Sequence, residues 1–218
     1  MYLRNVILAT LVLAMVAFAQ NPISADSPFQ VRYAANLQFG ESYIDISNSG
    51  ANGAPLLGPG FGNAAGNICV NVYAFSPDEQ LISCCSCFVT PNGLVSLGVN
   101  RDLTSNPLTG VIPTSVVVKL VATLAGTGGS GGATACNNSA ATVTTATPVS
   151  GMVAWGTTLH ATPVAGTYAT TETAFTPATL SAGELASIGG RCAAILGNGS
   201  GYGVCRSCRA GALGAPTK

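Results

Sequence analysis

Charged residues are scarce in this chain, and their scarcity excludes several classes of partner. The 218 residues include 8 Lys and Arg and 8 Asp and Glu, so 7% of the chain is charged and the formal net charge is zero. Typical soluble domains carry about 25% charged residues. Because no basic patch or polybasic run exists, we expect neither nucleic acid nor an anionic membrane surface as a partner.

Histidine is almost absent as well, which narrows the possible chemistry. The single histidine, His160, excludes the two- and three-histidine metal sites of most hydrolytic metalloenzymes. It could act as a general base, but no acidic residue is its neighbour in the sequence, and a solvated strand position is the more common role. The G-x-S-x-G match at 128–132 lies in a Gly/Ser run with no helix after it, so we interpret it as accidental. We therefore expect no enzyme and no cofactor.

Long apolar runs are missing except at the N-terminus. Arg4 precedes the apolar segment Val6–Phe18, and Ala17–Ala19 has the small-x-small form of a cleavage site. The run is short for a membrane span, which needs about 20 residues. We predict a signal peptide over residues 1–19. After cleavage the chain would have no stable membrane insertion and would be secreted, extracellular or at the cell surface, or periplasmic if retained.

Cysteine, in contrast, is abundant, and in an exported protein it indicates disulfides. Oxidising compartments form and keep such bonds. The number is even, so complete pairing is possible, but eight cysteines allow 105 pairings and the sequence does not choose among them. The disulfide candidates are Cys69, Cys84, Cys85, Cys87, Cys136, Cys192, Cys205 and Cys208.

The segment 67–100 holds four of these cysteines and reads as three consecutive strands. Apolar residues alternate with others at a period of two, and Ser76–Glu79 and Thr90–Gly93 carry strong turn signals. In the second strand Leu81, Cys85 and Cys87 share one face, the last two about 7 Å apart at about 3.3 Å per residue, whereas Ile82 and Cys84 face the other way. We expect a meander in which the cysteine cluster has at least two separate partners.

The remaining chain completes an all-β pattern with one helix. Ser181 and Glu184 form a capping box before a helical run, and 114–124 is apolar on both faces, as a central strand would be. About seven strands predict an antiparallel two-sheet sandwich, either jelly-roll or immunoglobulin-like. The expected divisions are a signal peptide 1–19, an arm 20–40, one domain 41–200 with a mobile excursion 125–150 and a helix 180–196, and a cysteine-containing tail 201–218.

Two arrangements of the cysteines would carry chemistry rather than structure. Cys205-Arg206-Ser207-Cys208 is a C-x-x-C beside arginines that would stabilise a thiolate, although it lacks the βαβ setting of redox proteins. Cys85 and Cys87 could join that motif in a four-thiolate zinc site, but their spacing is shorter than usual and export favours oxidation. Structural disulfides are the interpretation we prefer.

Three segments resemble a family of secreted, cysteine-rich bacterial proteins. They are GESYIDISNSG (40–50), GNICVNVYAFSPDEQLISCCSCFVTPNGL (66–94) and LSAGELASIGGRC…GSGYGVCRSCR (180–209), with the CCSC and CRSC clusters as the most distinctive parts. The resemblance covers most of the mature chain. It implies export and a bacterial source, and it brings no activity, ligand or catalytic residue.

The sequence therefore favours a non-enzymatic, secreted or cell-surface structural or interaction protein, and the low net charge favours self-association. One alternative is an extracellular glycan- or protein-binding module that uses the loops at one end of the sandwich, with Trp155, Tyr168 and Tyr202 as contacts. A second alternative is an exported thiol-redox or metal-binding protein that uses the C-x-x-C. Two sequons, at Asn137 and Asn198, fall in expected loops, and their glycosylation depends on the host.

Overall fold

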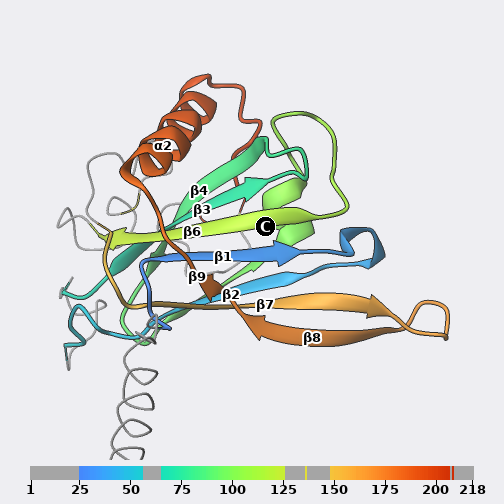
Figure 1. Ribbon diagram of the computed structural model, residues 1–218, viewed down its shortest axis with the longest axis horizontal. Coiled ribbons are helices and arrows are strands. Elements are labelled where there is room, and N and C mark those ends of the chain that lie inside the picture. The colour runs from blue at the N-terminus through green and yellow to red at the C-terminus, as the bar shows by residue number, and fades with distance from the viewer. Residues whose placement is uncertain (1–24, 56–64, 126–135, 137–147, 207, 209–218) are drawn as a thin grey trace, which may run out of the picture.

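The computed structural model describes residues 25–55, 65–125, 136, 148–206 and 208, and in this part the chain forms a two-sheet antiparallel β-sandwich (Figure 1). The five-stranded sheet has the order β4-β3-β6-β1-β9 and the four-stranded sheet the order β5-β2-β7-β8. Every pairing between neighbouring strands is antiparallel. The strands are β1 Phe29–Ala34, β2 Tyr43–Asn48, β3 Ile68–Phe75, β4 Leu81–Val89, β5 Leu94–Gly98, β6 Val116–Leu124, β7 Met152–Ala161, β8 Tyr168–Ala174 and β9 Thr176–Pro177.

The core lies between the two sheets and is centred on β6. Val118 and Leu120 of β6 face Ile44 and Ile46 of β2 within one cluster of completely buried side chains. Val121, on the other face of β6, is also buried, in a second cluster outside the sandwich. The prediction of a central strand with two buried faces is therefore confirmed.

Strand β1 is an element that the sequence analysis missed, because it falls in the expected arm 20–40. It pairs with β6 on one side and β9 on the other. Its polar residues Gln30 and Arg32 face inward, opposite Leu120 and Val118, and both are buried. Gln30 Nε2 donates a hydrogen bond to the carbonyl of Met152 at 2.6 Å, so the buried side-chain amide has a partner. Because polar residues occupy the inward positions of β1, the sequence pattern did not reveal the strand.

Arg32 connects the two sheets by reaching from β1 to β7 and β8. Its Nε donates to Thr173 Oγ1 at 3.2 Å and its Nη2 to Thr158 Oγ1 at 2.8 Å. Gly156 makes room for it, because a Cβ at that position would overlap with the guanidinium group. Burial lowers the pKa of Arg32, while the nearby carboxylate of Glu172 acts in the opposite direction.

The expected meander over 67–100 is wrong at its third strand. The turn after β3 returns the chain as a hairpin to β4, as predicted, but β5 belongs to the other sheet and pairs with β2. The chain crosses at Pro91–Gly93, where Asn92 N donates to the carbonyl of Asn48 at 2.8 Å. The Asn48 side chain also donates to Val89 O at 3.0 Å, which holds β2 against the end of β4. The turn at Thr90–Gly93 was predicted correctly, but the local sequence does not determine which sheet the chain joins after it.

A bulge near the start of β4 changes which side chains share a face. The β3–β4 register pairs Ala74 with Ser83 but Phe75 with Leu81, so Ile82 is the extra residue. Leu81 consequently lies on the outer side with Cys84, and Ile82 turns into the sandwich. The predicted alternation is therefore correct from Ser83 onward and wrong for Leu81 and Ile82.

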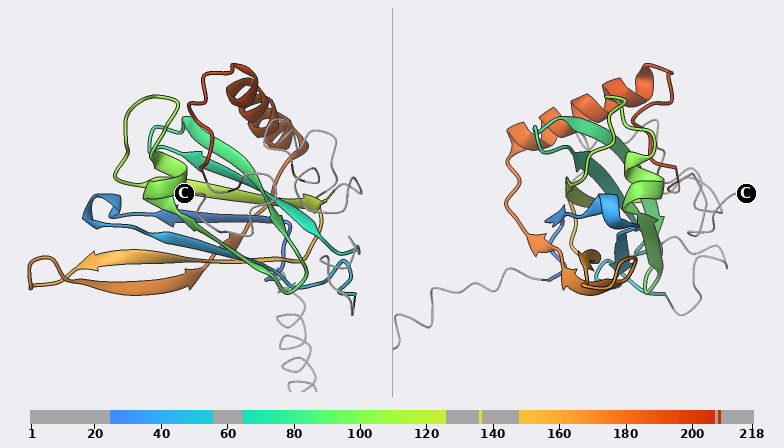
Figure 2. Two further views of the ribbon diagram at one scale, coloured as in Figure 1. Left: turned by 180° about the vertical axis from the view of Figure 1, so that it is seen from behind. Right: turned by 90° about the vertical axis from the view of Figure 1, so that its right-hand side faces the viewer.

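The helix α2, Ala182–Gly197, covers the outer side of the five-stranded sheet over β4 (Figures 1 and 2). Ser181 is its N-cap and its Oγ accepts a hydrogen bond from Glu184 N at 3.1 Å, as the capping box predicted. Ile188 and Ile195 are its buried apolar contacts. Within the described ranges no helix has the length and apolar character that crossing a membrane requires. Two short helical turns, η1 Leu37–Phe39 and η3 Val99–Thr104, complete the fold.

Candidate functional site

The cysteines form a complete covalent framework. All eight are paired, with Cα–Cα distances of 4.8 to 5.9 Å, within the usual range for disulfides. Three of the four bonds start from β4. The pairs are Cys69–Cys136, Cys84–Cys192, Cys85–Cys205 and Cys87–Cys208.

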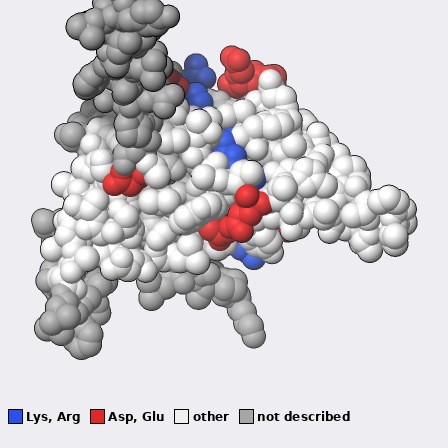
Figure 3. Space-filling model, turned by 60° about the horizontal axis from the view of Figure 1, so that its bottom comes forward, with Lys and Arg blue, Asp and Glu red and all other residues white. Residues whose placement is uncertain are grey.

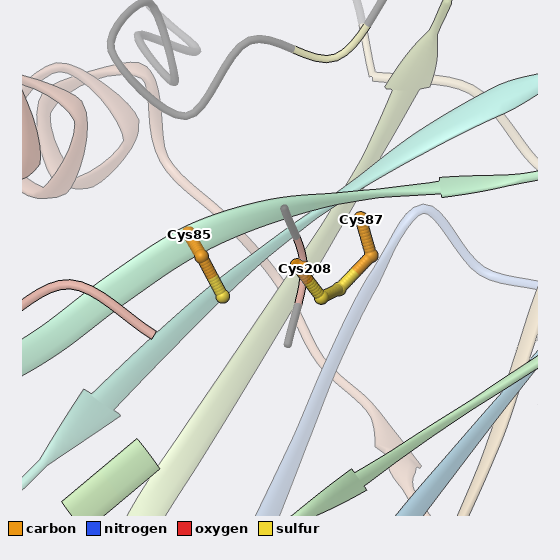
Figure 4. Close-up of side chains that lie close together, drawn as sticks. All are labelled: Cys85, Cys87 and Cys208. Atoms are coloured by element: carbon orange, nitrogen blue, oxygen red, sulfur yellow. A yellow bond between two sulfur atoms is a disulfide. The ribbon is translucent and has the colours of Figure 1, made fainter. Parts of the chain in front are cut away.

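Strand β4 uses its two faces for different partners. Cys84 lies in the outer cluster, where it bonds Cys192 of α2. Cys85 and Cys87 face the inter-sheet core and bond the tail segment at Cys205 and Cys208. Figure 4 shows Cys85 and Cys87 projecting from one side of the strand toward the segment that carries Cys208. The expectation of at least two separate partners for the cluster is confirmed.

The tail also adds backbone pairing to β4. Val204 forms a parallel bridge with Cys84, and Cys84 N donates to Gly203 O at 2.9 Å. Gly203 N in turn donates to the carbonyl of Asn106 at 2.8 Å. The described part of the tail, residues 201–206 and 208, is therefore fixed along the edge of the five-stranded sheet by hydrogen bonds as well as by two disulfides.

The C-x-x-C does not form a dithiol–disulfide unit of its own, because Cys205 and Cys208 bond β4 and not each other. The sulfur atoms of Cys85, Cys87 and Cys208 nevertheless lie within 4.8 Å of one another. Thiolates around one zinc ion would be similarly close, given Zn–S distances of about 2.3 Å. Oxidised sulfurs are not thiolates, so a metal at these positions stays a prediction for the reduced chain alone.

The three predicted ligand contacts do not come together. Trp155 is half-buried on β7, and Tyr202 is exposed on the tail, two residues before Val204. Tyr168 is exposed at the start of β8, with its ring centroid 6.0 Å from that of Phe39. Tyr168 thus lies beside the exposed ring of Phe39, whereas Tyr202 belongs to a segment that is hydrogen-bonded to Asn106, close to the exposed Leu108.

One end of the sandwich gathers most of the exposed large hydrophobic residues of the described chain. It is formed where β1 ends, β2 and β6 begin, and the β7–β8 hairpin extends beyond the rest of the sandwich (Figures 1 and 2). A hollow of about 500 Å³ lies there between the β3–β4 turn and the segment 109–114. We call these residues the apolar end: Tyr33, Phe39, Tyr43, Leu108, Val111, Ile112, Val164 and Tyr168.

The apolar end could not be found from the sequence, since its residues are isolated in six segments. Two other sites considered in the sequence, His160 and Asn198, lie within the described residues. His160 is exposed near the end of β7 and its Nε2 is in hydrogen-bond contact with Thr171 Oγ1. Asn198 caps α2, and its side chain accepts from Ser200 N at 2.7 Å. The G-x-S-x-G match and Asn137 lie outside the described residues.

Comparison with known proteins supplies no relative for this arrangement. The scan against family models, the search of curated proteins and the search of solved structures each returned no match.

Proposed function

We propose that this protein is an exported, non-enzymatic interaction protein that works outside the reducing cytoplasm, at the cell surface or free in the surroundings. The observation that carries the proposal is the complete pairing of eight cysteines. Such bonds persist in oxidising compartments. The signal sequence expected at 1–19 and the resemblance to secreted bacterial proteins support export from the side of the sequence.

The interaction role is supported by the character of the surface. The face drawn in Figure 3 is mostly uncharged, as the composition requires. The apolar end exposes Val111 by 69% and Ile112 by 63%, beside a hollow that Val111 also lines. Val111 is the residue of the apolar end that lines the hollow, and exposed apolar surface of this kind is typical of contact surfaces for proteins. We therefore assign the apolar end to a protein partner.

Intact mass of the protein recovered from outside the cell tests the export part. Alkylation before and after reduction counts the thiols, and metal content is measured on the same sample. We expect a chain that begins at Gln20, with eight cysteines masked until reduction and no metal. Free thiols at Cys205 and Cys208, or stoichiometric zinc, would instead support the thiol or metal alternative.

The apolar end is tested by a pair of matched substitutions. Ile112→Ser changes a residue of the apolar end, whereas Leu94→Ser changes a side chain of equal exposure, 63%, outside it. The readout is the fraction of exported protein that remains bound to the producing cells after washing. We expect Ile112→Ser to lower that fraction several-fold and Leu94→Ser to leave it unchanged. Equal retention of both variants would remove the apolar end from the interaction, and retention abolished by glycosidase treatment would replace the protein partner with a glycan.

A further inference from the structure

A second concavity lies beside the contact between α2 and the five-stranded sheet. Its volume is about 470 Å³, within the range of pockets that take small molecules. One wall is a single face of α2, the other is the β3–β4 turn, and β6 forms the floor. The lining residues are Phe75, Ser76, Pro77, Glu79, Val117, Lys119, Glu184, Ser187, Ile188 and Arg191.

Charge is concentrated in this pocket. Four of its ten lining residues are charged, two of each sign, in a chain with only 7% charged residues. Three further lining residues are apolar: Phe75 and Ile188 are buried, and Val117 is half-buried. A ligand that matches this lining has an apolar body and carries both signs of charge.

One of the two charge pairs is already satisfied within the protein. Lys119 Nζ lies 2.6 Å from Glu184 Oε1 and 4.9 Å from the centre of the Phe75 ring. Both charged side chains are half-buried, with relative exposures of 25% and 34%. This pair ties α2 to β6 and gives the pocket one closed side.

The other two charges are available to a ligand. Glu79 lies in the β3–β4 turn and Arg191 on α2, so they stand on opposite walls. Across the described ranges the ion pairs are Arg101–Asp102 and Lys119–Glu184, and neither involves Glu79 or Arg191. Glu79 also has a φ of 64°, a left-handed conformation that glycine or asparagine adopts at lower cost.

The wall that carries Arg191 is fixed in place. Cys192, the next residue, is bonded to Cys84 of β4, which is the strand that leaves the turn containing Glu79. The two charges are therefore held on a covalently closed frame. Fixed ligand contacts bind more tightly than contacts that must first be ordered.

We propose that this pocket binds a short apolar peptide with free ends, of dipeptide size. The peptide ammonium group contacts Glu79, its carboxylate contacts Arg191, and its side chains pack on Phe75, Val117 and Ile188. Because the charges stand on opposite walls, a ligand with separated charges fits better than a free amino acid, whose two charges share one carbon. Two extended residues separate the terminal groups by up to about 7 Å. The pocket shares Ser76 and Pro77 of the β3–β4 turn with the hollow at the apolar end, but none of the residues that define the apolar end lines it.

The experiment is calorimetric titration of the exported, oxidised protein with the dipeptide Leu-Leu, its N-acetyl form, its C-terminal amide and free leucine. We expect saturable binding of Leu-Leu, and a loss of about tenfold for each capped form, which corresponds to one charge-assisted hydrogen bond. Free leucine is expected to bind more weakly than Leu-Leu. No saturable binding of Leu-Leu, or equal binding of all four compounds, would overturn the proposal.

Charge-removing variants assign each end of the peptide. Glu79→Gln is expected to abolish the preference for a free N-terminus while keeping the preference for a free carboxylate, and Arg191→Gln the reverse. Glu172→Gln and Arg206→Gln remove exposed charges outside the pocket and are the matched controls. Thermal unfolding of each variant verifies folding. If the folded pocket variants discriminate capped from free peptides as the native protein does, these residues do not hold the ligand.

Discussion

Cys84 and Cys85 are consecutive residues whose disulfides leave β4 on opposite sides, Cys84 toward α2 and Cys85 toward the tail. The alternation of side chains along a strand produces this divergence. One short segment thereby joins the helix, the tail and the sandwich. The two bonds have different tasks, since one shapes the pocket under α2 and the other closes the inter-sheet core.

Removal of the Cys85–Cys205 bond tests its contribution to stability. The double variant Cys85→Ala/Cys205→Ala is expected to lose about 2–5 kcal/mol of unfolding free energy. Urea unfolding of the oxidised proteins measures the loss. Arg206→Ala, an exposed neighbour, is the control and should change stability by less than about 0.5 kcal/mol. An equally stable double variant would show that the bond is dispensable.

Tyr73 is a position where a substitution is expected to stabilise the native protein. Its side chain is completely buried, and within the described chain its hydroxyl has no hydrogen-bond partner. Tyr73→Phe keeps the ring and removes the orphan group, so we expect a gain of about 1 kcal/mol in unfolding free energy. A loss of similar size in urea unfolding would mean that the hydroxyl is satisfied in solution.

The same residue gives the protein an alkaline limit. Burial raises the pKa of Tyr73 above its ordinary value of 10.0. The unfolded chain then ionises first, so the stability from the neutral side chain is fully present below about pH 10 and is lost as the pH rises further. Unfolding free energy measured from pH 8 to 11 should fall less steeply for Tyr73→Phe. Tyr33→Phe, at an exposed position, should follow the native profile.

Glu79 is expected to lower the unfolding free energy of the protein while it strengthens binding of the peptide. Because its φ is 64°, Glu79→Gly should raise unfolding free energy by about 1 kcal/mol. Asn92→Gly is the matched control: its φ is 59°, and asparagine tolerates this region, so the gain should be a few tenths of a kcal/mol. The same Glu79→Gly protein should bind Leu-Leu more weakly in calorimetry. A destabilised Glu79→Gly variant would show that the glutamate side chain supports the turn.

Gly156 and Arg32 are expected to be coupled. Gly156→Ala forces the guanidinium of Arg32 to move and should cost about 1–3 kcal/mol. In an Arg32→Ala background the same change should cost less than about 0.5 kcal/mol, which a double-mutant cycle by urea unfolding measures. Gly190→Ala, on the open side of α2, should instead stabilise the protein by about 0.5–1 kcal/mol. Equal costs in both backgrounds would rule out the steric coupling.

The features predictable from the sequence are those set by local periodicity. The alternation around Cys84 and Cys85, the cap at Ser181 and the two-faced strand β6 all follow from neighbouring residues. Strand β1 did not follow, because Gln30 and Arg32 face the interior and find their partners on β7 and β8, more than 100 residues away. A polar residue with a distant partner has the same appearance in the sequence as a solvated one.

The features that depend on how sheets and helix meet were equally out of reach. The crossing of the chain at Pro91–Gly93 is decided by Asn48, which lies on another strand. The disulfide partners of β4 are decided by where α2 and the tail come to rest. The pocket is lined by segments that are far apart in the chain, with Glu79 in the β3–β4 turn and Arg191 on α2, and only the scarcity of charge could have drawn attention to these two residues.

The position of the disulfides on β4 also determines how the molecule transmits force. A pull applied at Cys208 enters the fold at Cys87 through a covalent bond. The chain between these two residues, which includes β5 to β9 and α2, is then a covalently closed loop. A force applied between Cys208 and the chain before Cys87 can therefore pass through this bond without straightening the loop. The segments 105–115 and 162–167 and the helix lie within it.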